Sequence, residues 1–253
     1  KLEKRFADWP FKGETPSPIP TNARLAAPGV YLVNKDVNQG RVSLMLPGIL
    51  RDDPDYLAAR VMNYILGGGG FTSRLVNRIR SDEGLAYSAG STVPGGIYYP
   101  LIISAEFQSK SPTVAFATSI ILEELLAIRT KPVTDEELDT TKKYFTEVFP
   151  RMFANKAAVA SAFAADEFTG RYAKQPDFWK TYRQRLGAVT RDDVQRVAGR
   201  LLQTNQMVVL VVGQKDEIQK GHPDHKASLS DLGGGKIIDV PLRDPLTLQP
   251  MGK

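Results

Sequence analysis

The chain has 253 residues, of which 42% are hydrophobic and 24% are charged, and this ordinary balance excludes a disordered chain. Its net charge of +5 comes from lysine and arginine residues scattered among acidic ones, which predicts no nucleic-acid surface, and no uninterrupted apolar run approaches the roughly 18 residues of a membrane span. Cysteine is absent, which excludes disulfides, cysteine-ligated zinc and thiol catalysis.

Residues 1–28 are rich in proline and follow no helical or strand period, which predicts an irregular connector between domains. Their charged start has no apolar run after it and so does not match a signal peptide. A leader removed from a longer precursor would leave the same sequence. For the compartment we expect the periplasm or secretion rather than the cytoplasm.

Two strands are expected after the connector. Residues 30–33 are apolar, and residues 41–46 alternate between polar and apolar side chains, as a half-buried strand does. The segment between them, NKDVNQG, is rich in turn residues. We therefore expect the two strands to pair directly.

Helical periodicity begins at Asp53 and ends at a run of four glycines, Gly67, Gly68, Gly69 and Gly70. A second, shorter helix is expected to begin at Thr72 or Ser73 as its N-cap and to end near Gly84. Both helices therefore border the glycine run.

The second half of the chain is predicted to contain mostly helices. Strands at 85–93 and 97–107, joined by a hairpin-like link at Pro94, are followed by helices at 112–129, 134–169 with an interruption at Pro150, 176–187 and 191–202, and by a buried strand at 207–212. Residues 216–253 are rich in glycine, proline and charge and are expected to form a peripheral C-terminal extension. The order of elements predicts one α+β domain over 29–215, with a largely antiparallel sheet packed against several helices.

The glycine run does not match a nucleotide-binding loop. A P-loop has lysine and then serine or threonine after its last glycine, where this chain has Phe71 and Thr72, and a dinucleotide fingerprint follows a strand rather than a helix. We expect a helix end with a tight approach between two helices, which glycine permits because it has no Cβ. A loop that contacts the substrate backbone is compatible with that structure, so Gly67–Gly70 is a candidate substrate loop.

The two histidines do not form a recognisable zinc motif. His222 and His225 are three positions apart, enclose Pro223 and lie in the expected extension, whereas helical zinc motifs place two histidines four apart with a glutamate between them. We expect solvated loop histidines and no metal bound by this chain.

Arg80 and Tyr87 are the candidate catalytic residues. Taken singly, each is an ordinary surface residue, but the turn at Gly84 folds the start of a strand back towards the end of the helix that carries Arg80. A guanidinium and a phenol at one place can donate hydrogen bonds to a carbonyl oxygen or to the oxyanion that it becomes.

The segment NYILGGGGFTSRLVNRIRSDEGLAYSAGS resembles the second-half domain of the pitrilysin, insulysin and mitochondrial processing peptidase family of zinc peptidases. The resemblance continues in LEKRFADWP at 2–10, which is similar to the end of a preceding homologous domain, and in the order of strands and helices from 30 to 213. It implies a processing-peptidase-like α+β roll. The inverted zinc motif of the family, His-x-x-Glu-His, is not present in this sequence.

The resemblance implies that a homologous domain or subunit, as a partner, carries the zinc, and that Arg80 and Tyr87 complete its active site. An extended peptide substrate would lie along a sheet edge as an added strand. Two other functions remain open: a non-catalytic scaffold or peptide-binding module of the same fold, and an unrelated nucleotide-binding domain. The third function predicts that ATP stabilises the protein against heat, which we do not expect.

Overall fold

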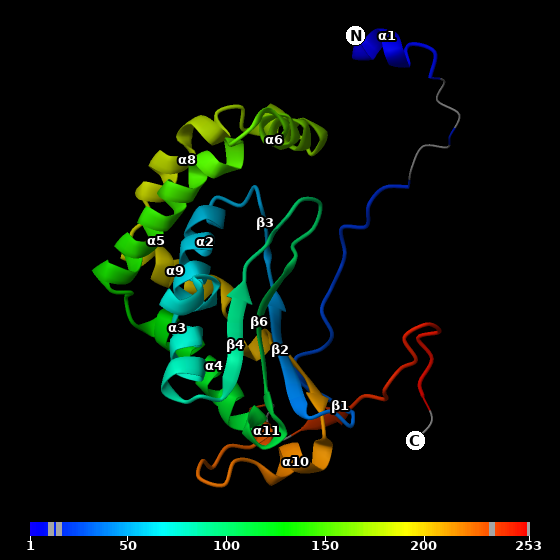
Figure 1. Ribbon diagram of the computed structural model, residues 1–253, viewed down its shortest axis with the longest axis vertical. Coiled ribbons are helices and arrows are strands. Elements are labelled where there is room, and N and C mark those ends of the chain that lie inside the picture. The colour runs from blue at the N-terminus through cyan, green and yellow to red at the C-terminus, as the bar shows by residue number, and fades with distance from the viewer. Residues whose placement is uncertain (10–12, 14–16, 233–235, 252–253) are drawn as a thin grey trace.

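A six-stranded sheet forms the centre of the molecule in the computed structural model, which describes residues 1–9, 13, 17–232 and 236–251 (Figure 1). The strand order is β4-β6-β2-β7-β1-β8. Neighbouring strands are antiparallel from β4 to β7, and β1 is parallel to both β7 and β8. The strands are β1 (Gly29–Asn34), β2 (Gln39–Pro47), β4 (Ala86–Thr92), β6 (Ile102–Lys110), β7 (Val208–Gly213) and β8 (Ile237–Asp239), with a separate parallel pair of β3 (Ile49–Leu50) and β5 (Gly95–Gly96).

Helices cover one face of the sheet, whereas the described parts of both chain ends run past its other side (Figure 1). The α-helices are α1 (Leu2–Phe6), α2 (Tyr56–Asn63), α3 (Arg74–Val76), α4 (Val114–Thr130), α5 (Asp135–Val148), α6 (Lys156–Phe168), α7 (Arg171–Lys174), α8 (Phe178–Gly187), α9 (Arg191–Leu201), α10 (Lys215–Lys220) and α11 (Leu229–Leu232). Two π-helical segments are at Tyr64–Gly68 and Asn77–Asp82, and 3-10 turns are at Gly70–Thr72, Ser111–Thr113, Phe149–Phe153 and Thr204–Gln206. This architecture confirms the α+β prediction with a mostly antiparallel sheet.

The core lies between the sheet and the helices. Strand β2 shows the pattern that produces it: Val42, Leu44 and Leu46 point inwards and are buried, while the alternate residues face the uncovered side. Burying these side chains on one face supplies most of the favourable free energy of folding, at about 25 cal/mol per Å² of apolar surface. The other face keeps polar residues such as Arg41 and is therefore available for binding.

Helix α4 with its preceding turn, Ser111–Thr130, is long and apolar enough to cross a membrane by length and composition alone, with a mean hydropathy of 1.4. Within the fold, 56% of this apolar window is buried, and Ala117 and Ile121 are buried on its inner side. Packing against the sheet accounts for the apolar composition. The expectation that the chain has no membrane span stays a prediction.

The expected direct pairing of the first two strands is wrong. Strand β7 lies between β1 and β2 and pairs with both. Residues 35–38 therefore cross one intervening strand, about 10 Å, instead of forming a tight hairpin. The N–H of Lys35 donates to the carbonyl of Gly213 at 2.9 Å, which joins this crossing to the end of β7. The turn composition of the segment did not reveal the inserted strand, because β7 comes from a distant part of the sequence.

Strands β4 and β6 pair as predicted, but β6 begins at Ile102 rather than at residue 97. Residues 97–101 form a loop that folds back over β5, where a Cβ at Gly96 would lie 1.7 Å from the carbonyl oxygen of Tyr99. The predicted helices are present, including the break at Pro150. At the start of α9, Thr190 and Asp193 form the predicted capping box, in which the Asp193 N–H donates to Thr190 Oγ1 at 3.1 Å.

Three parts of the segment after residue 215 are not peripheral, in contrast to our expectation: Ile218, Leu229 and strand β8. Strand β8 extends the sheet beside β1, and Ile218 and Leu229 belong to the hydrophobic core. The sequence suggested a tail because the segment is rich in glycine, proline and charge. Parts of both predicted end segments, 10–12 and 14–16 in the connector and 233–235 and 252–253 in the extension, lie outside the described residues. The domain boundaries at 28 and 215 stay predictions.

Replacing Ile218 by alanine should lower the free energy of unfolding by about 2 to 5 kcal/mol, because its side chain is 2% exposed and packs against Gly40 and Gly213. As a control, Leu246→Ala should change it by less than about 0.5 kcal/mol, because Leu246 is 91% exposed. Urea unfolding followed by circular dichroism measures both. Equal effects of the two substitutions would show that the segment after residue 215 is not part of the core.

Candidate functional site

Arg80 lies against two aromatic rings, which come from segments on both sides of it in the sequence. The central guanidinium carbon of Arg80 is 4.6 Å from the centroid of the Phe71 ring and 4.6 Å from that of the Tyr87 ring. These distances are typical of cation–π contacts. The structure therefore brings the two predicted catalytic residues together and adds Phe71, which the sequence analysis did not single out. We call these three residues the cation–π cluster.

The helix that carries Arg80 is anchored in the hydrophobic core by a buried side chain. It begins as α3 and continues as the π-helical segment Asn77–Asp82, in which Ile79 is completely buried. The N–H of Leu85 donates to the carbonyl of Ile79 at 2.9 Å, and Gly84 between them has a φ of 62°, which glycine adopts without strain. This turn brings the start of β4, and with it Tyr87, back beside Arg80, as predicted.

Three arginines lie within seven residues of one another, and their partners distinguish them. Arg74 donates to both carboxylate oxygens of Glu137, at 2.6 and 2.8 Å. Arg78 donates to two neighbouring glutamates of α4, Glu124 at 2.9 Å and Glu123 at 3.2 Å. Arg80 has no hydrogen bond or ion pair with any residue in the described ranges 1–9, 13, 17–232 and 236–251. Its N–H donors are therefore available to a ligand, whereas those of Arg74 and Arg78 hold the helix in place.

A β-bulge at the start of β4 presents Tyr87 to solvent. Ala86 pairs with Ser109 and Ala89 pairs with Phe107, so Tyr87 and Ser88 together oppose one residue of β6. A bulge of this kind breaks the alternation of a strand and re-aims its side chains. Both bulged residues are exposed, and Tyr87 keeps 82% of its surface in solvent. Strand β4 is at the edge of the sheet, so the phenol stands at that edge.

The glycine run ends the first helix and lets it approach β4. A Cβ on Gly67 would lie 2.5 Å from the backbone nitrogen of Ser91 and 2.9 Å from Leu75 of the second helix. The predicted tight approach between the two helices is therefore present, with a strand as a further partner. Gly70 has a φ of 58° and open space around it, and the Ser73 hydroxyl donates to its carbonyl at 2.6 Å. Phe71 follows directly and is carried outwards by this turn.

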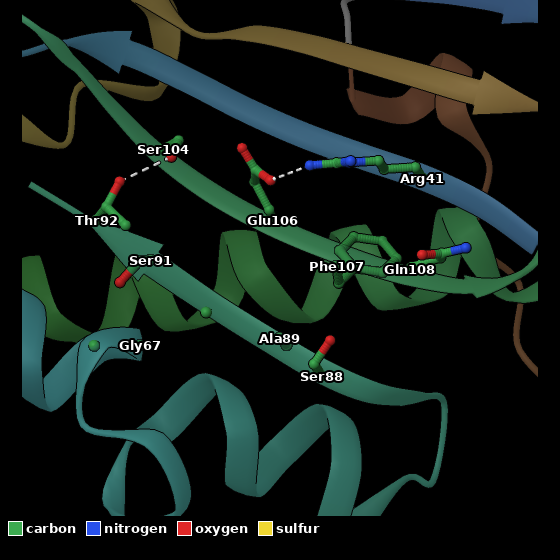
Figure 2. Close-up of a pocket in the computed structure, with 12 residues that line it drawn as sticks. Arg41, Gly67, Ser88, Ala89, Ser91, Thr92, Ser104, Glu106, Phe107 and Gln108 are labelled. Carbon is green, nitrogen blue, oxygen red and sulfur yellow. Dashed lines mark hydrogen bonds and ion pairs between the residues drawn. The ribbon is translucent and has the colours of Figure 1, made fainter.

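A polar groove of about 660 Å³ lies on the uncovered face of the sheet, over β4, β6 and β2 (Figure 2). Its floor contains a hydrogen bond of 3.0 Å between the hydroxyls of Thr92 and Ser104 and an ion pair of 2.9 Å between Arg41 and Glu106. Gly67 and Gly68 line the groove, but Gly69, Gly70, Arg80 and Tyr87 are not among its lining residues. Ser88 connects the two places, because it lines the groove and directly follows Tyr87.

Sequence reasoning missed this groove because its residues come from three strands and the end of a helix. In β2 and β6 the polar positions alternate with apolar ones, which indicates only a solvent-facing side, and β4 has no regular alternation because of its bulge. The register between the strands decides which polar residues meet. The pairing of Val42 with Phe107, for example, places Arg41 within reach of Glu106.

His222 and His225 lie in a loop, as expected, and they interact with an aromatic ring of α4. The His225 ring stacks on Phe116 with centroids 3.8 Å apart, and the His222 ring lies 4.7 Å from that of His225. Within the part of the chain that the structure describes, no three histidine, cysteine, aspartate or glutamate side chains are grouped so that they could hold a metal ion. The donor set that a catalytic zinc requires, three protein ligands and an open position, is therefore not found in these residues.

Glu137, on helix α5, binds Arg74 and so connects the helical layer to the segment that carries Arg80. Burial raises its pKa, but hydrogen bonds from Arg74 and from Thr134 outweigh this effect and hold the pKa below its usual value. Its carboxylate accepts the N–H of Thr134 at 2.8 Å and completes the capping box of α5. The same side chain thus starts a helix and anchors the segment that leads to Arg80.

A family model described as the inactive domain of peptidase M16 matches residues 1–145, more than half of the chain. A protein of Streptomyces coelicolor named an uncharacterized zinc protease is 41% identical over 70 residues, 28% of this chain and 15% of that protein. The Helicobacter pylori protein YmxG, named a non-peptidase homolog, is 33% identical over 113 residues, 44% of this chain and 25% of that protein. The chain thus matches a quarter or less of the length of these two relatives.

The fold is also similar to that of a solved structure. The peptidase M16 inactive domain from Pseudomonas fluorescens matches with a TM-score of 0.68 and 24% sequence identity. The match covers 80% of this chain and 47% of that chain. At this level of identity the similarity establishes the fold and leaves the chemistry of the site to the side chains described above.

Gly67→Ala should lower the free energy of unfolding by about 1 to 3 kcal/mol, because the added methyl group meets the backbone of Ser91. Gly187→Ala is the matched control: a Cβ there meets no atom within 4 Å, and we expect a change of less than about 1 kcal/mol. Urea unfolding gives both values. If Gly67→Ala lowers the free energy of unfolding no more than its control does, the close approach of helix and strand does not require glycine at position 67.

The contribution of Glu137 to stability should depend on pH. Because its pKa is lower in the folded state than the ordinary value of 4.5 for a glutamate, the stabilisation is complete above that value and is lost as the pH falls through the folded-state pKa. Glu137→Gln should therefore reduce stability by about 1 to 3 kcal/mol at pH 7 and by much less at pH 3. Glu136→Gln, at the exposed neighbour, should show no such trend. If the difference in stability between Glu137→Gln and the parent were the same at pH 7 and pH 3, the lowered pKa of Glu137 would be contradicted.

Proposed function

The chain belongs to the peptidase M16 family as an inactive domain, and we propose that it completes the active site of a zinc endopeptidase whose metal is held by a homologous partner domain or subunit. The observation that carries the proposal concerns Arg80: its guanidinium is half-buried, lies against the ring of Tyr87 and has no acidic partner among the residues described. The family match and the similarity to a protein named a zinc protease support it.

In this proposal Arg80 and Tyr87 bind the scissile carbonyl of a peptide. Both side chains are hydrogen-bond donors, and the hydrogen bonds that they donate become stronger when the carbonyl oxygen becomes an oxyanion. Zinc bound in the partner would supply the activated water that attacks the peptide. The role of this chain is to bind and orient the peptide and to donate hydrogen bonds.

We place the substrate at the start of β4. This strand is at the edge of the sheet, where an extended peptide can pair with backbone N–H and C=O groups. Gly67 packs against the strand at Ser91, so the bulged residues Tyr87 and Ser88 mark the accessible stretch. Gly67 and Gly68, as the substrate loop, would border the peptide where the polar groove begins. A periplasmic or secreted location is part of the same proposal.

A second candidate is a non-catalytic scaffold or peptide-binding module. The similarity to the Helicobacter pylori protein named a non-peptidase homolog favours it. In that case the exposed donors and the polar groove would hold a peptide without cleaving it. Titration of the chain with its co-purified partner separates the two: peptidase activity that appears only in the mixture supports the first proposal, and inert complexes at every ratio support the second.

Arg80→Ala and Tyr87→Phe in the assembled peptidase should each lower kcat about 100- to 1000-fold, which is the effect of removing one oxyanion donor. Tyr87→Phe keeps the ring against Arg80 and removes only the hydroxyl, so it isolates the hydrogen bond. Complex formation, measured by analytical ultracentrifugation, should remain unchanged.

Arg151→Ala and Tyr98→Phe serve as controls, because both residues are exposed and lie outside the cluster and the groove. The kcat of a peptidase assembled with either control variant should stay within about twofold of that of the parent peptidase. Unchanged turnover in both Arg80→Ala and Tyr87→Phe would remove the catalytic role from this pair.

A further inference from the structure

Phe71 is a large apolar side chain that remains mostly in solvent, with 68% of its surface exposed. Exposed phenylalanine usually needs no explanation when it stands alone. Phe71 does not stand alone, because its ring contacts the guanidinium of Arg80 at 4.6 Å. The residue at the tip of the glycine run is therefore in contact with the candidate catalytic arginine.

The loop holds Phe71 in a fixed place. Gly70 turns the backbone with a positive φ and begins the 3-10 turn Gly70–Thr72, which has Phe71 at its centre. The Thr72 hydroxyl donates to the carbonyl of Gly69 at 2.9 Å, and Ser73, which is completely buried, donates to that of Gly70. These bonds tie the loop on both sides of Phe71, so the ring stands on a supported turn.

An arginine side chain without an ion-pair partner has many accessible rotamers, and binding a ligand with it costs entropy. An aromatic ring over a face of the guanidinium restricts these rotamers and leaves the N–H donors free, because they lie in the plane of the group. Tyr87 makes one such contact, and Phe71 makes a second. With two ring contacts, the direction of the donors is set before a ligand arrives.

We propose that Phe71 is a positioning residue, which orients Arg80 towards the substrate carbonyl through its cation–π contact. This inference rests on the proposed function of Arg80 as a donor to that carbonyl. It gives the glycine run a further role, since the turn at Gly70 places the ring. Phe71 then acts through Arg80 and does not itself need to touch the substrate.

The contact itself is tested in the full chain by NMR, without catalysis. Ring currents should shift the side-chain resonances of Arg80 upfield, observed with isotope-labelled arginine. Phe71→Leu, which keeps an apolar side chain of similar size, should move them towards the positions of an unstacked arginine, and Phe71→Tyr should retain the shift. Arg80 resonances that are the same in Phe71→Leu as in the parent would overturn the proposal.

The functional step is tested in the assembled peptidase with a double-mutant cycle. Phe71→Leu should lower kcat/KM about two- to fivefold, the size expected from an exposed cation–π contact, and Phe71→Tyr should restore it. In the background of Arg80→Ala, Phe71→Leu should have no further effect, because the residue acts through the arginine. Phe168→Leu is the matched control, since Phe168 is 83% exposed and lies on α6.

The two experiments separate the proposals from each other. If Arg80→Ala leaves turnover unchanged, the proposed function fails, while the NMR result still decides whether Phe71 orients the arginine. If Arg80→Ala lowers turnover as expected but Phe71→Leu causes an equal loss in the parent and in the Arg80→Ala background, Phe71 contacts the substrate directly and the positioning role is wrong.

Discussion

The missing Cβ at Gly67 is the constraint on which the site depends. Because nothing projects from this residue, the end of the first helix can lie against the backbone of β4 at Ser91. That contact fixes where the glycine run leaves the helix and therefore where Phe71 is carried. It also lets the second helix approach the end of the first at Leu75. The three members of the cation–π cluster come from three different segments, and they meet because these segments are packed together at one point.

The arginines of the second helix have two different roles, which depend on whether a glutamate pairs with them. Arg74 and Arg78 are held by glutamates from α5 and α4, so their charges stabilise the packing of the helix. A paired arginine would have to break these bonds before it could bind a ligand, which would cancel much of the gain. Arg80 faces aromatic rings instead. Both helices that border the glycine run also end in π-helical turns, a local irregularity that is common at functional sites.

Local patterns predicted the helices, the Thr190 capping box, the β4–β6 pair and the proximity of Arg80 and Tyr87, because each depends on residues that are near in sequence. Long-range relations could not be predicted in this way. The insertion of β7 between β1 and β2 depends on a strand that follows more than 150 residues later, and the groove depends on the register of three strands. The sequence singled out Arg80, but the ion pairs of Arg74 and Arg78 depend on the positions of glutamates on other helices. Phe71 was missed because an aromatic residue after glycines has no periodic signal.

An arginine that lies against aromatic rings and has no acidic partner among the described residues is suited to a reaction in which negative charge appears during turnover. The ground-state carbonyl carries only partial charge, so a fixed donor binds it weakly, whereas the oxyanion is bound strongly and without reorganisation. Such a donor accelerates nothing without a nucleophile on the other side of the carbonyl. If the nucleophile is held by a second domain, the two halves must close on the peptide and exclude water, which strengthens the hydrogen bonds of Arg80 and Tyr87 at the same moment. The exposure of Phe71 and Tyr87 in the chain by itself would then follow from an active site that is divided between two domains.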